Sequence, residues 1–102
     1  MKKLIRVSGV YETPMGWAIS GSNPARIDTK EDFINQEFED PRKNSKPLEF
    51  IAYKDSFDNL KKIKIEKFEM TSNMSNTCTL NILLGDISLP EEIKEGTPIY
   101  RG

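Results

Sequence analysis

The clearest pattern in this chain is a two-residue alternation of apolar and polar side chains. Residues 77–84 show it best, because one face of that segment is entirely apolar: Cys78, Leu80, Ile82 and Leu84. Neighbouring side chains of a strand point to opposite faces, so this segment is predicted to be a strand with one buried face. Shorter stretches of the same kind predict strands at 3–11, 16–20, 48–54 and 97–101.

Turn residues indicate how these strands connect. Residues 12–16 hold Pro14 and Gly16, which favour a tight turn, so 3–11 and 16–20 are predicted to form a hairpin that ends at residues 21–24. The strand at 48–54 is apolar on both faces and is therefore predicted to be central in a sheet. Pro98 lacks an amide donor, which predicts an edge position for the strand at 97–101.

Residues 60–71 change phase in the middle. Ile63 and Ile65 share one face of a strand, whereas Phe68 and Met70 share the other. A bulge near Glu66 and Lys67 would bring all four onto one face, because one extra residue reverses the direction of the side chains. A helix is the alternative, but the four apolar residues lack helical spacing.

One helix is predicted at 29–39. Asp28 or Thr29 can cap it, Phe33, Ile34 and Phe38 give it a narrow apolar face, and Pro41 follows its end. Residues 40–47 are predicted to be an exposed loop, and residues 88–92 a short helical turn that begins at Pro90.

These elements predict a single domain over residues 1–102 of the α+β class. It has a mostly antiparallel sheet of five to six strands in the order ββαβββ, then a short helical turn and an edge strand. One amphipathic helix packs on the sheet. A small, partly open β-barrel is the alternative.

Composition argues against an enzyme. The 102 residues include no histidine, which is the usual proton shuttle and the commonest metal ligand. Cys78 is the only cysteine, and its place on the apolar face of a strand predicts a buried core residue rather than a nucleophile. The acidic residues lie in open polar stretches rather than across a cleft. We therefore expect no catalytic residues, no cofactor and no metal.

The same features bear on location. Lys2 and Lys3 precede only two apolar residues before Arg6, so no signal peptide is expected. A single cysteine cannot form an intramolecular disulfide, which is typical of reducing compartments. No stretch approaches the roughly 20 apolar residues of a membrane span. The expectation is a cytoplasmic protein that does not bind membranes.

Net charge is −1, but the charges are segregated. Residues 28–40 hold six acidic residues and one lysine, and a basic loop follows. A dense acidic helix face can bind a basic partner by electrostatic complementarity. The first hypothesis is thus a non-catalytic protein-binding module, such as a small inhibitor or an immunity-type neutralising partner. Its candidate binding residues are Glu31, Asp32, Glu37, Glu39, Asp40, Arg42 and Lys43.

Two alternatives stay open. Nucleic-acid binding requires cations for the phosphates and aromatic rings for the bases, and the candidate strip is Tyr53, Lys61, Lys62 and Lys64. Lys62 and Lys64 are predicted to face solvent side by side, opposite Ile63. The second alternative is a structural subunit of a larger assembly, such as a phage or secretion particle.

Overall fold

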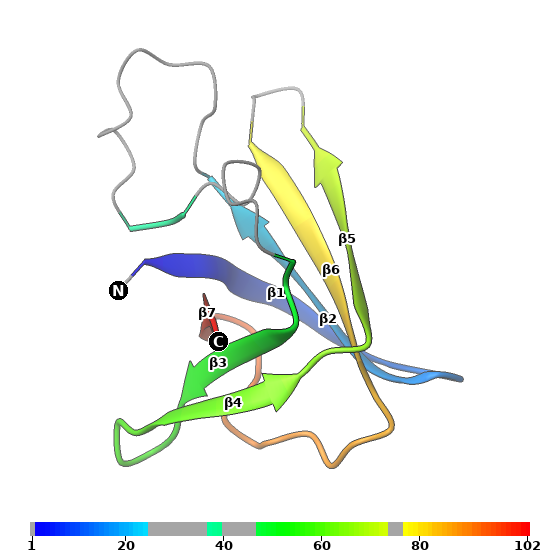
Figure 1. Ribbon diagram of the computed structural model, residues 1–102, viewed down its shortest axis with the longest axis vertical. Coiled ribbons are helices and arrows are strands. Elements are labelled where there is room, and N and C mark those ends of the chain that lie inside the picture. The colour runs from blue at the N-terminus through cyan, green and yellow to red at the C-terminus, as the bar shows by residue number, and fades with distance from the viewer. Residues whose placement is uncertain (1, 25–36, 40–46, 74–76) are drawn as a thin grey trace.

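A computed structural model describes residues 2–24, 37–39, 47–73 and 77–102 of the chain. In these residues seven strands form one open antiparallel sheet with the order β4-β3-β7-β1-β2-β6-β5 (Figure 1). The strands are β1 (Lys3–Thr13), β2 (Gly16–Asn23), β3 (Phe50–Lys54), β4 (Leu60–Lys64), β5 (Lys67–Ser72), β6 (Cys78–Gly85) and β7 (Pro98–Arg101).

The predicted α+β class is wrong, because the described residues form no helix. Most of the helix predicted at 29–39 lies outside the described residues, but its last three residues are not helical. Phe38 makes a parallel bridge with Lys3, whose amide donates to the Glu37 carbonyl oxygen. Phe38 is buried by this contact with a distant part of the chain, which local helix signals do not report.

Two further predictions also need correction. The short helical turn predicted at 88–92 is instead a non-helical turn over residues 90–93, which the Ile93 amide closes by donating to the Pro90 carbonyl oxygen. The alternative of a partly open barrel is wrong as well, because the sheet ends at two separate edges, β4 and β5. Figure 1 shows these two strands running at a steep angle to each other, so the open sheet is strongly coiled.

The predicted N-terminal hairpin is confirmed by the pairing of β1 with β2. The Thr13 hydroxyl donates to the Gly16 carbonyl oxygen in its turn, and Gly16 has a φ of 109°. The second strand continues to Asn23 instead of ending at residues 21–24. Gly21 permits this, because a Cβ there would lie 2.4 Å from the Arg6 carbonyl oxygen of β1.

The central position predicted for β3 is confirmed, since it lies between β4 and β7. The edge position predicted for the last strand is wrong, because β7 lies between β3 and β1. Pro98 is tolerated there as the first residue of the strand. It pairs with Arg6 on β1, whereas β3 pairs only with Tyr100 and Arg101 further along.

Residues 60–71 form two strands rather than one strand with a bulge. The chain bends at Ile65 and Glu66, and from there β4 and β5 pair with different neighbours. Ile63 lies opposite Ile51, and Phe68 lies opposite Ile82. The phase slip in the sequence therefore marks the break between the two edge strands, and Ile63, Phe68 and Met70 all face the core side.

The core lies against one face of the coiled sheet. Its fully buried side chains come from five strands: Leu4, Ile5, Ile19, Ile51, Cys78, Leu80, Ile82, Leu84 and Ile99. The apolar face predicted for residues 77–84 is confirmed, because all four of its residues belong to this core. The prediction that Cys78 is a buried core residue is confirmed with it.

Candidate functional site

The structure describes only two of the seven predicted partner-binding residues. Five lie outside the described residues: Glu31, Asp32, Asp40, Arg42 and Lys43. The Glu37 side chain is 73% exposed, and its carboxylate lies 3.8 Å from the Lys3 ammonium. The binding role of this set stays a prediction, but it cannot rest on a helix that includes residues 37–39.

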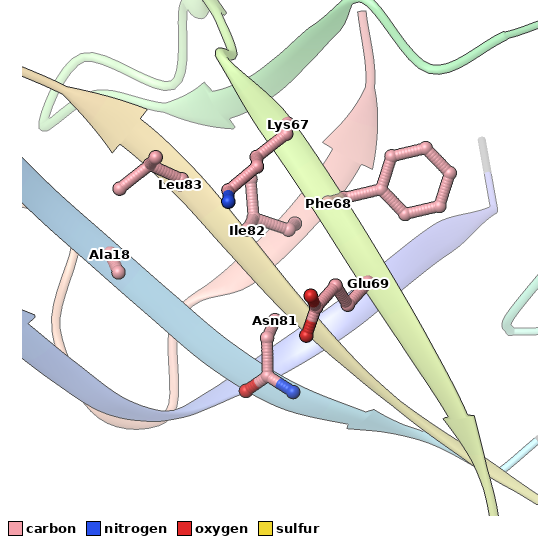
Figure 2. A pocket seen from close by; sticks show the side chains of 7 residues that line it. All are labelled: Ala18, Lys67, Phe68, Glu69, Asn81, Ile82 and Leu83. Carbon is pink, nitrogen blue, oxygen red and sulfur yellow. The ribbon is translucent and has the colours of Figure 1, made fainter. Parts of the chain in front are cut away.

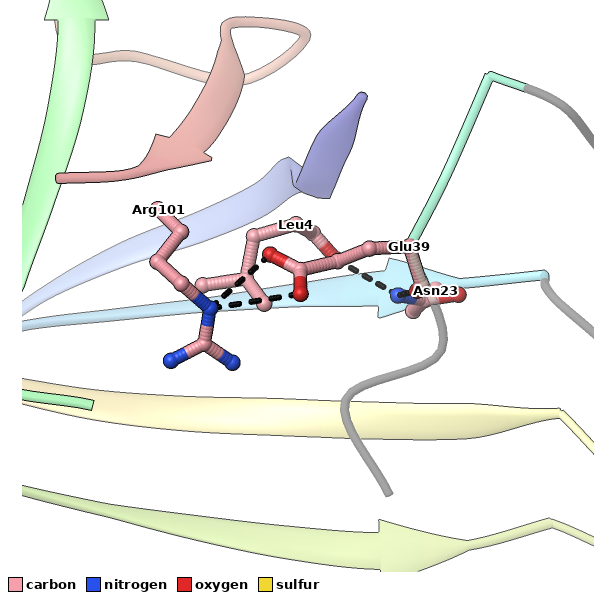
Figure 3. Close-up of polar contacts among 4 residues, drawn as sticks. All are labelled: Leu4, Asn23, Glu39 and Arg101. Atoms are coloured by element: carbon pink, nitrogen blue, oxygen red, sulfur yellow. Dashed lines mark hydrogen bonds and ion pairs between the residues drawn. The ribbon is translucent and has the colours of Figure 1, made fainter. Parts of the chain in front are cut away.

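Glu39 has a structural position. Its side chain is 18% exposed, and the Arg101 Nε atom donates to both of its carboxylate oxygens at 3.2 Å (Figure 3). The Asn23 side-chain amide donates to the Glu39 and Leu4 carbonyl oxygens, at 2.6 and 2.8 Å. These contacts attach the segment around Glu39 to β1, β2 and β7, so this carboxylate is largely enclosed by its own chain.

The predicted nucleic-acid strip is divided between two faces of the sheet. Tyr53 and Lys61 lie opposite each other on β3 and β4 and share one face. Lys62 and Lys64 share the other face, as predicted, where they lie opposite Ala52 and Phe50. The four residues therefore do not form one continuous surface.

Tyr53 is also buried, so its ring offers no open platform for a base. Burial raises the pKa of the Tyr53 phenol, and the nearby Glu92 and Asp55 carboxylates raise it further. Both effects disfavour the phenolate, which keeps Tyr53 in its neutral form and in the core cluster.

The described residues contain no group of three or more histidine, cysteine or acidic side chains that could hold a metal ion. The Asp55 carboxylate belongs to a turn, in which it accepts from the Phe57 and Asn59 amides at 2.9 Å. Among the same residues, no helix has the length and apolar character needed to span a membrane.

The most unusual surface is the edge of β5 that faces away from β6. All six of its residues are exposed, and β6 is its only strand partner in the described residues. Phe68 and Met70 continue the apolar face of Ile82 and Leu80, yet each is 38% exposed. As far as the described part of the chain goes, β5 therefore presents unpaired backbone groups next to two partly covered apolar side chains.

The opposite edge, β4, has a different character. Three of its five residues are lysines, Lys61, Lys62 and Lys64, which hinder another strand from pairing there. β5 has a single lysine and no proline, so the two edges of one sheet differ in how well they are protected.

A shallow hollow of about 190 Å³ lies on the outer face beside β5 (Figure 2). Ala18 and Leu83 supply apolar lining on β2 and β6, while Lys67 and Glu69 supply charges on β5. Figure 2 shows Lys67 and Glu69 on one side of β5 and Phe68 on the other. The β5 edge thus has a charged outer side and an apolar inner side.

Sequence reasoning did not identify β5 as a candidate site. The available signal was the phase slip at Glu66 and Lys67, which is compatible with a bulge inside one strand or with a break between two. Only the sheet order shows that the break places Phe68 and Met70 at an edge.

Comparison of the chain with protein-family models, with curated proteins and with solved structures finds no match.

Proposed function

We propose that this chain is a non-catalytic protein-binding module that binds its partner by strand addition at β5. The observation that carries the proposal is the exposed six-residue edge with Phe68 and Met70 on its inner side. Protein binding is the function class predicted from the sequence. The proposed binding surface is β5, however, and not the acidic residues.

Strand addition fits the chemistry of this edge. The backbone of an incoming strand would satisfy the outward-pointing amides and carbonyls of β5, which supplies affinity for an extended segment. Side chains of that strand would cover the exposed parts of Phe68 and Met70, which adds a hydrophobic contribution and some sequence preference. The favoured partner segment is an extended strand with apolar residues at alternate positions.

The contrast with β4 supports the choice of edge. Exposed edges invite aggregation, and proteins commonly protect them with lysines, as β4 does. An edge left without that protection costs solubility unless something covers it. We infer that β5 is covered by a partner when the protein is at work.

The test uses one substitution on each edge. Met70→Lys places a charge on the inner side of β5, and Leu60→Lys is the matched control on β4, where Leu60 is 43% exposed. We expect tagged wild-type and Leu60→Lys chains to capture similar amounts of a partner. The Met70→Lys chain should capture about tenfold less of it, because the lysine charge would have to be desolvated in the interface. The measurement is quantitative mass spectrometry of the captured proteins.

Hydrogen exchange then tests the binding mode. Addition of the captured partner should slow exchange at the backbone amides of residues 67–72 and leave residues 60–64 unchanged. A partner held equally by all three chains, or protection confined to other segments, would contradict strand addition at β5.

A further inference from the structure

We infer that the strand received by β5 is β5 of a second copy of this chain, related by a two-fold axis through Phe68. This inference rests on the proposed function and names its partner. A two-fold axis perpendicular to the sheet makes the two β5 strands antiparallel and keeps the inner face of one copy continuous with that of the other.

The charges of β5 select the register. With the axis at Phe68, Lys67 lies opposite Glu69 of the second copy and Glu69 lies opposite its Lys67, so two ion pairs form on the outer face. With the axis at Glu69, two carboxylates oppose each other. With the axis at Met70, Glu69 faces only Thr71, and no ion pair forms.

Within the described part of one copy, the same charges lack ion-pair partners. Neither Lys67 nor Glu69 makes an ion pair with any described residue, whereas Lys61 on β4 lies 4.0 Å from the Asp55 carboxylate. Both side chains project from the same face of β5, opposite to Phe68 (Figure 2). The β5 edge is therefore complementary to itself in charge.

The apolar side agrees with this register. Phe68 lies opposite Phe68 of the second copy across the axis. Aromatic pairs at opposite positions of antiparallel strands stabilise a sheet. Pairing of two short edges buries less surface than a standard protein interface. We therefore expect a weak dimer, with a dissociation constant in the micromolar range or above, which must be studied at high protein concentration.

The test exchanges the charges of Lys67 and Glu69 by substitution. Sedimentation analysis at low ionic strength, up to about 1 mM protein, then measures dimerisation. Lys67→Glu alone and Glu69→Lys alone each turn two ion pairs into two like-charge contacts and should raise the dissociation constant about tenfold or more. The double variant K67E/E69K restores both pairs and should dimerise like the wild type. Lys62→Glu, the same charge change on β4, is the control and should have no effect.

Mixing gives the sharpest readout. A Lys67→Glu chain carries two carboxylates at the interface, and a Glu69→Lys chain carries two ammonium groups. Each should self-associate about tenfold more weakly than the wild type, and an equimolar mixture should form a heterodimer that is at least as stable as the wild-type dimer. Since both variants must fold to associate, the mixture also tests their folding.

Three results would overturn the inference: a wild type that stays monomeric at about 1 mM, a dimer indifferent to these charges, or single variants that fail to associate when mixed. A monomeric wild type combined with Met70-dependent capture of another protein would show that strand addition occurs with a different partner. The proposed function would then survive without this inference.

Discussion

Asn23 is completely buried, and its side-chain amide connects three segments of the chain. From the end of β2 it donates to the carbonyl oxygens of Leu4 on β1 and of Glu39. Together with the ion pair between Glu39 and Arg101, these bonds hold residues 37–39 against the sheet. A single amide thus gives the segment around Glu39 much of its attachment.

Asn23→Ala should lower the free energy of unfolding by about 2–3 kcal/mol, because one buried and one partly buried carbonyl oxygen lose their donor. Urea denaturation gives the measurement. Ser22→Ala, a change at the exposed neighbouring position, is the control and should change stability by less than about 0.5 kcal/mol. Equal stabilities of the two variants would show that the Asn23 bonds contribute nothing.

Tyr53 leads to a prediction on pH. Burial and the Glu92 and Asp55 carboxylates raise the pKa of its phenol above the ordinary 10.0, so the folded state holds this proton more tightly than the unfolded state. The resulting stability is fully present below pH 10 and is lost as the pH rises through the folded-state pKa. The free energy of unfolding should therefore decrease above pH 10.

Tyr53→Phe removes this contribution, so its stability should decline less between pH 9.5 and 11.5 than that of the wild type. Tyr11→Phe is the control, because Tyr11 is 54% exposed, and it should follow the wild type. Denaturant unfolding at each pH provides the comparison. Parallel curves for Tyr53→Phe and wild type would refute the assignment.

The two edge strands, β4 and β5, both expose backbone groups to other chains, but their side chains treat this exposure differently. The lysines of β4 protect its backbone from pairing with other chains, whereas β5 has alternating charges and apolar residues. The composition of an edge thus decides whether it stays unpaired. This difference can be tested by removal of the lysines.

The triple substitution of Lys61, Lys62 and Lys64 to threonine should make the protein aggregate, as measured by light scattering over time. Threonine favours strands, and the lost lysines no longer hinder pairing at β4. The variant's net charge becomes more negative, which by itself would improve solubility. A triple arginine variant is the control and should stay monodisperse; a threonine variant that does the same would contradict the protective role.

Strands with regular alternation could be predicted from the sequence, as residues 77–84 and the N-terminal hairpin show. The helix at 29–39 was predicted from capping signals, but Phe38 is buried by a bridge to Lys3, 35 residues earlier. Local patterns contain no information about such a contact. The position of Lys62 and Lys64 on one face of β4 could also be predicted, because it depends only on the alternation of side chains along a strand.

At the scale of the whole molecule, sheet order determines what each strand can do. β4 and β5 are consecutive in the chain, with Ile65 and Glu66 between them, yet they form opposite edges. Pairings such as β1 with β7 join the two ends of the sequence. An edge site is a property of this order, which explains why periodicity alone could not locate β5.

The pairing of β1 with β7 also determines how the molecule would respond to a pulling force. Lys3 lies opposite Tyr100, so the beginning of β1 and the end of β7 are at the same end of this antiparallel pair. Tension applied through these two residues would load the backbone hydrogen bonds one after another rather than all together. The centre of the sheet would then unzip from that end, and the fold would have little mechanical resistance in this direction.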